Sequence, residues 1–167
     1  MLEDPIEQFL ALSAVLTGFS RADLLGTGVA HEYYHTMVSV VGERIAGEIL
    51  AAGADAIVQS LENDGDAEDA VRGAIILDPK FGPVATNIIN MWYLGLWTHL
   101  PHQWRNSYGG HPKDVDRVVS ARAYTESLVW RAIGTHPPAA KQPGYGTWGL
   151  EPRFDPISDI SDFGPET

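Results

Sequence analysis

The sequence predicts a mostly α-helical protein, with a helical core of about four to five helices and a long extended arm at the C-terminus. Apolar residues recur at helical spacing in several segments before residue 134. Capping residues, prolines and glycines stand at the ends of those segments, as helix boundaries require. The sequence offers no convincing strand pairs. We therefore expect a helical domain over residues 1–134, and a partner-docking arm with an acidic tail over residues 135–167.

The first two helices are predicted in the N-terminal third of the chain. Asp4 can cap the first helix, Pro5 suits its first turn, and Gly18 is a good terminator. A second stripe of apolar residues follows at helical spacing. We expect this second helix to begin within residues 20–28 and to end at Gly53.

A short helix and a third long helix follow an acidic turn. The short helix should break at Asp78, which precedes a proline. The long helix should begin near Pro83 and stop at Pro101. Trp92 lies on its apolar stripe, and a helical aromatic stripe usually belongs to a core.

The last part of the helical domain begins with an irregular segment. Residues 102–114 are rich in glycine and proline, so we expect a loop there. Ser120 can then cap a final helix, and Gly134 would close it.

The arm combines prolines with aromatic residues in a way that suggests docking. Prolines remove backbone donors and forbid regular helix. The aromatic residues Tyr145, Trp148 and Phe154 have no periodicity that would bury them within the arm. Tyrosine and tryptophan are favoured anchors at protein interfaces, so we expect the arm to cover a partner. The alternative is that the arm folds back over its own helices.

Composition excludes several classes of function. The chain has 22 acidic and 11 basic residues, a formal net charge of −11, so it should repel nucleic acid and anionic membranes. No stretch is long and apolar enough to predict a direct membrane span. The chain contains no cysteine, which excludes a disulfide framework, a thiolate nucleophile and a cysteine-ligated iron–sulfur cluster within it.

One motif points to metal chemistry. His31, Glu32 and His35 form an H-E-x-x-H pattern on a predicted helix. This spacing places both imidazoles on one face, where they could hold zinc, with Glu32 as the base for a bound water. A third ligand is not evident in the sequence. A small zinc-dependent hydrolase is therefore the alternative function, and two ordinary helix histidines are the simpler interpretation.

Several segments, in their order along the chain, carry a resemblance to a known family. The likeness covers roughly residues 6–152, and no single segment is diagnostic. The segments are Phe9–Ser13, Leu16–Phe19, Leu24–Gly28 with Tyr33 and Tyr34, Asn87–Ile89 with Met91–Gly95, Leu128–Pro138 and Lys141–Trp148. Together they resemble the small (gamma) subunits of bacterial membrane-associated FAD-dependent sorbitol, fructose and glucose dehydrogenases.

The resemblance implies a helper subunit, not an enzyme by itself. In that family the small subunit has no catalytic residues and binds no cofactor. A large subunit of the glucose–methanol–choline type carries FAD, with or without an iron–sulfur cluster, and oxidises a sugar or polyol. A cytochrome c subunit often accepts the electrons. The small subunit supports folding, stability and export of the large one.

The resemblance also defines the expected interface and compartment. Family membership implies a periplasmic location through a twin-arginine signal, whereas genuine absence of that signal implies a cytoplasmic one. His31, Glu32 and His35 match no family feature.

A weaker third hypothesis is a self-sufficient helical domain that forms homo-oligomers through its arm. The expected partner-binding residues are Trp130, His136, Pro137, Pro138, Tyr145, Trp148 and Phe154.

Overall fold

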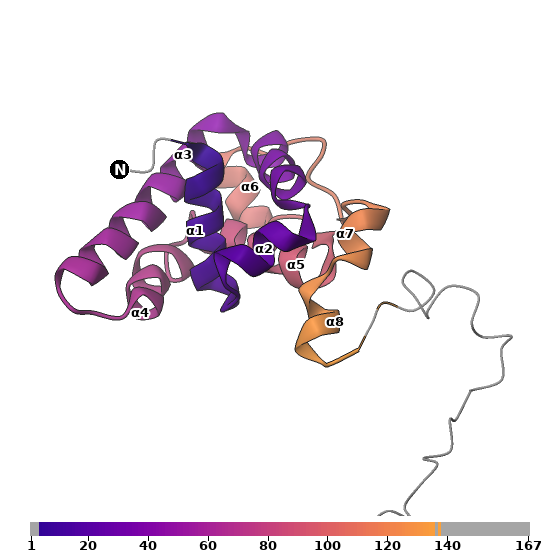
Figure 1. The fold of residues 1–167 in the computed structure, drawn as a ribbon. Coiled ribbons are helices and arrows are strands. Elements are labelled where there is room, and N and C mark those ends of the chain that lie inside the picture. The colour runs from indigo at the N-terminus through magenta and orange to yellow at the C-terminus, as the bar shows by residue number, and fades with distance from the viewer. Residues whose placement is uncertain (1–3, 136, 138–167) are drawn as a thin grey trace, which may run out of the picture.

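The computed structural model describes residues 4–135 and residue 137 of the chain. Helices hold 70% of these residues and strands hold 3%, which confirms the predicted mostly α-helical class (Figure 1). The greater part of the predicted arm, residues 138–167, lies outside the described residues.

The first helix, α1 (Pro5–Thr17), begins and ends as predicted. The Asp4 carboxylate accepts a hydrogen bond from the backbone N–H of Ile6 at 2.9 Å, which satisfies one of the free donors of the first turn. Gly18 ends the helix in the left-handed conformation, with φ of 72°.

The predicted second helix is in fact two helices, α2 (Arg21–Thr27) and α3 (Ala30–Glu62). Gly28 separates them because it adopts the left-handed conformation at φ 68°. The expected stop at Gly53 was wrong. A Cβ atom at Gly53 would lie 3.0 Å from Leu12 Cδ1, so this glycine permits close packing of α3 on α1 instead of ending the helix.

A kink divides α3 into two parts. Gly42 has φ 79° and ψ 157°, which is far from helical geometry and favours glycine. Figure 1 shows α3 changing direction along its length. The second part continues toward α4 (Ala67–Val71), which runs directly into the π-helical turn η1 (Arg72–Ile76).

The third long helix, α5, spans Gly82–Leu94 and is shorter than predicted. The break before it is as expected, because the Asp78 side chain accepts hydrogen bonds from the backbone N–H groups of Lys80 and Phe81. Its stop at Pro101 was wrong. Gly95 ends the helix at φ 68°, and a Cβ there would lie 2.8 Å from the carbonyl oxygen of Ala123.

The segment between α5 and α7 is more ordered than the predicted loop. β1 (Leu96–Trp97) pairs antiparallel with β2 (Arg117–Val118). Helix α6 (His102–Tyr108) occupies part of the segment expected to be a loop. It forms because tertiary burial of Trp104 overrides the local glycine and proline signals, and the indole N–H donates to the Lys80 carbonyl at 2.7 Å.

The predicted final helix is divided into α7 (Ala121–Thr125) and α8 (Leu128–Ala132). The Ser120 cap is confirmed, since its hydroxyl accepts from the backbone N–H of Ala123 at 3.0 Å. Ser127 lies at the break, where it is buried and donates its hydroxyl to the Ala123 carbonyl at 2.7 Å. This bond satisfies a polar group that would otherwise be buried without a partner.

Aromatic side chains from α1, α3 and α5 form the centre of the core. The Trp92 ring stacks on Phe9 with centroids 6.2 Å apart and meets the edge of Tyr33 at 4.9 Å. All three rings are fully buried, so the core position predicted for Trp92 is confirmed.

Among the residues that the structure describes, no single helix is long and apolar enough to cross a membrane. Helices α1 and α2 together pass by length and composition, but they are bent by 109° relative to each other.

Candidate protein interface

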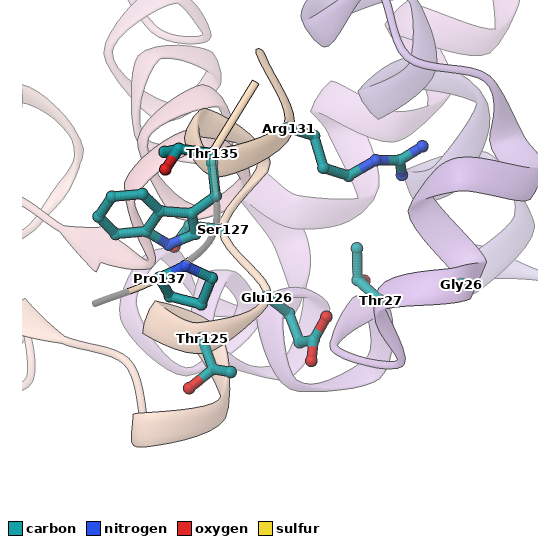
Figure 2. A pocket seen from close by; sticks show the side chains of 9 residues that line it. Gly26, Thr27, Thr125, Glu126, Ser127, Arg131, Thr135 and Pro137 are labelled. Atoms are coloured by element: carbon teal, nitrogen blue, oxygen red, sulfur yellow. The ribbon is translucent and has the colours of Figure 1, made fainter. Parts of the chain in front are cut away.

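An open pocket lies where α2, α7 and α8 meet, close to the C-terminal end of the described residues. Its volume is about 160 Å³, below the roughly 300–1,000 Å³ typical of small-molecule sites. Figure 2 shows the side chains around it. The lining residues are Gly26, Thr27, Thr125, Glu126, Ser127, Trp130, Arg131, Thr135 and Pro137.

Trp130 is the principal side chain of this pocket, and local contacts fix its orientation. Its indole N–H donates to the Tyr124 carbonyl at 2.9 Å. Its ring meets the Tyr124 ring edge-on, with centroids 5.5 Å apart. The indole is only half-buried, so part of its apolar surface remains free to contact another molecule.

A turn after α8 returns the chain to the pocket. The Thr135 N–H donates to the Trp130 carbonyl at 2.8 Å, and Pro137, two residues later, is buried and lines the same pocket. Figure 2 shows Pro137 beside Ser127 and above Thr125. The first residues of the predicted arm therefore lie against α7 and α8.

Exposed apolar side chains accompany the pocket. Leu25 is 43% exposed, Tyr124 37% and Ile133 64%. Leu25 and Tyr124 are each adjacent in sequence to a lining residue, and Ile133 lies two positions from the lining residues Arg131 and Thr135. With Trp130 and Pro137 they form what we call the corner surface. Figure 1 shows α7 and α8 on the opposite side of the view from α4.

A surface ion pair links α8 to α2. Arg131 donates to the Asp23 carboxylate at 2.6 Å, and its guanidinium lies 5.6 Å from the Phe19 ring centroid. The hydrogen bond from the Ser20 hydroxyl, followed by that from Arg131, holds the pKa of the Asp23 carboxyl below its usual value.

Two of the predicted partner-binding residues, Trp130 and Pro137, are brought together in one pocket. The other five, His136, Pro138, Tyr145, Trp148 and Phe154, lie outside the described residues. Sequence reasoning missed the contributions of Gly26, Thr27 and the α7–α8 break. Only the resemblance carried by segment 24–28 pointed to α2. The proximity of α2 to α8 is a tertiary contact, which the local sequence does not indicate.

The three residues of the metal motif do not assemble into a catalytic site among the described residues. His31 and His35 are exposed on the first part of α3. Glu32 instead accepts a hydrogen bond from the Ser120 hydroxyl at 3.0 Å. No group of three or more metal-ligating side chains occurs within residues 4–135. Among the residues that the structure describes, the motif therefore lacks the third protein ligand that a catalytic zinc site uses.

Tyr33 lies between these residues in sequence but belongs to the core. Burial, followed by the nearby carboxylates of Glu32 and Glu126, raises the pKa of its hydroxyl well above the usual value. The hydroxyl donates to the Ala123 carbonyl at 3.4 Å. Tyr33 thus links α3 to α7 and holds the helix that carries Tyr124.

Comparison of the sequence with protein-family models and with curated proteins, and comparison with solved structures, found no match to this chain.

Proposed function

We propose that this chain is a non-catalytic small subunit that binds and stabilises a large FAD-dependent dehydrogenase of the glucose–methanol–choline type. The observation that carries the proposal is the corner surface. There a half-buried tryptophan and a buried proline line an open pocket at the start of the predicted arm. Trp130 and Pro137 of this surface belong to segment 128–138, which resembles the small-subunit family.

The chemistry of the corner surface suits protein recognition. A tryptophan with a fixed orientation brings a large apolar area at little entropic cost, which is typical of interface hot spots. Leu25 and Ile133 would surround it with further apolar area on association. The pocket is too small for a typical sugar or flavin site, but it can receive one side chain of a partner.

The division of labour follows from the resemblance. FAD, and an iron–sulfur cluster where one is present, would be carried by the large subunit, which would oxidise the sugar or polyol. Electrons would pass to a cytochrome c subunit. This chain would support folding, stability and export of the large subunit. Its net charge of −11 favours a partner with a basic contact surface.

No observation favours the zinc hydrolase. Its proposed base, Glu32, is engaged by Ser120, and the described residues supply no third ligand for His31 and His35. Homo-oligomerisation through the arm concerns residues outside the described ranges, and no contact among the described residues supports it.

Co-purification tests the proposed function. The full chain, untagged, is co-expressed with a tagged large flavoprotein of the glucose–methanol–choline type, and the eluate is analysed for flavin absorbance and stoichiometry. We expect a stable complex that contains both chains and FAD. Trp130→Ala should weaken binding at least about tenfold, as expected for a hot-spot truncation.

A matched variant separates the corner surface from general surface hydrophobicity. Leu61 is 72% exposed near the end of α3, and Leu61→Ala should leave binding unchanged. A second test uses Tyr145→Ala combined with Trp148→Ala, which should weaken binding through the arm. The proposal is wrong if the wild-type chain remains a monomer beside the flavoprotein, or if Trp130→Ala and Leu61→Ala bind alike.

A further inference from the structure

We propose that His31 and His35 form a two-histidine chelating site for a divalent transition-metal ion of the copper, nickel or zinc type. This inference is independent of the proposed function, because the two histidines lie outside the corner surface.

The backbone places the two imidazoles side by side. Within α3 the only residue with non-helical φ and ψ is Gly42, so the helix is regular from Ala30 through His35. Residues four apart on a regular helix lie on the same face, with Cβ atoms roughly 5–6 Å apart. Two imidazoles at this spacing can bind one ion through one ring nitrogen each.

The ring nitrogens of these two histidines are free for ligation. Neither ring takes part in a hydrogen bond or ion pair with any described residue, although the His35 ring packs edge-on to Tyr34 at 5.3 Å. His99, His102 and His111 differ, because the Nδ1 atom of each is already engaged with a neighbouring group. The pair on α3 thus combines the right spacing with uncommitted donors.

The surroundings determine what kind of site this is. Imidazole ligands suit copper, nickel and zinc, and the affinity of such sites generally rises from nickel to copper and falls again at zinc. Because the described residues add no third ligand, the remaining positions would be filled by water or by a group from outside the described residues. The nearby helix N-terminus disfavours a cation, whereas the negative charge of the chain as a whole favours one.

Metal titration of the full chain, purified without a polyhistidine tag, tests the site. We expect isothermal titration with Ni²⁺ and with Cu²⁺ to give one ion per chain, with Cu²⁺ bound more tightly. His31→Ala and His35→Ala should each weaken binding at least tenfold, because each leaves a single imidazole. His111→Ala is the matched control and should bind as the wild type does.

Thermal unfolding of the variants shows whether they remain folded. Both substituted histidines are exposed, so we expect unchanged melting in the absence of metal. The proposal is overturned if the wild-type chain binds no ion. It is equally overturned if binding survives unchanged in either single variant, because the ion would then be held elsewhere.

Discussion

Two tryptophans, Trp92 in the core and Trp130 at the corner surface, have the same side chain in contrasting surroundings. Trp92 is 1% exposed and packs against both Phe9 and Tyr33. Trp130 is half-buried, and the only ring it contacts within residues 4–135 is Tyr124. The difference teaches that burial separates an aromatic residue of the core from one with apolar surface left in solvent, so mutation can separate fold stability from the proposed partner binding.

The largest expected effect comes from truncating the core tryptophan. Trp92→Ala should lower the free energy of unfolding by about 3–5 kcal/mol, because it leaves a large cavity among buried rings. Trp130→Ala should lower it by only about 1 kcal/mol, since its ring is partly in solvent already. Urea denaturation of the two variants measures both values.

A conservative variant sharpens this comparison. The Trp92 indole N–H is buried and has no hydrogen-bond partner among the described residues. Trp92→Phe therefore loses no hydrogen bond and should cost clearly less than Trp92→Ala, about 1–2 kcal/mol. Equal losses for Trp92→Ala and Trp130→Ala would show that the corner surface belongs to the same packing unit as the core.

The next prediction concerns the junction between the two regions. Gly18 and Gly95 both have positive φ, at 72° and 68°. A Cβ at Gly18 would meet no atom within 4 Å, whereas one at Gly95 would lie 2.8 Å from the Ala123 carbonyl oxygen. Gly18→Ala should cost about 1–2 kcal/mol for backbone strain alone, and Gly95→Ala should cost clearly more.

The outcome for Gly95 bears on how α7 is positioned. Thermal unfolding compares the two alanine variants, with Gly26→Ala as a control because Gly26 has no positive φ and space around it. If Gly95→Ala cost no more than Gly18→Ala, α7 would be able to move away from the end of α5. The corner surface would then be less firmly attached to the core than the packing indicates.

The sequence predicted those elements whose signals are local. Asp4 and Gly18 bound α1 because a cap and a left-handed glycine act within one turn. The helix end predicted at Gly53 was wrong and the one at Gly95 was missed for one shared reason. Each glycine is placed by a contact with a distant segment, Leu12 in one case and Ala123 in the other. A single sequence carries no direct record of such contacts.

The same limit applies to the candidate interface. Trp130 and Pro137 were predicted from the resemblance of their own segment, and they do share a pocket. The α2 residues that complete this pocket were not predicted, because residues about 100 positions apart meet there only through the fold. The π-helical turn η1 was also missed. Its hydrogen bonds span one residue more than those of an α-helix, and five residues are too few for this to change the spacing of apolar residues visibly.

The smallest expected effect on stability concerns Asp23, whose ion pair with Arg131 joins α2 to α8 at the edge of the corner surface. The lowered pKa of Asp23 means that its ionised form is stabilised in the folded chain. The stabilisation that ionised Asp23 gives the folded chain is therefore constant at neutral pH. It begins to be lost as the pH falls below about 4, the pKa of an aspartate in the unfolded chain, and it is gone below the lower pKa of the folded chain. On acidification through that range, the free energy of unfolding should therefore fall less in Asp23→Asn than in the wild type. Urea denaturation at one pH above the range and one pH below it measures this difference.

Two further variants identify which partner of Asp23 is responsible. The Ser20 hydroxyl bond is the larger cause of the lowered pKa and the Arg131 pair the smaller. Ser20→Ala should therefore reduce the pH dependence of the free energy of unfolding in the acidic range more than Arg131→Gln does. Because both partners are at the surface, each effect should be small and the Arg131 contribution should weaken with added salt. If Arg131→Gln instead removed most of the dependence, the link between α2 and α8 would be stronger than the Ser20 cap, and α8 would be anchored by charge more than by packing.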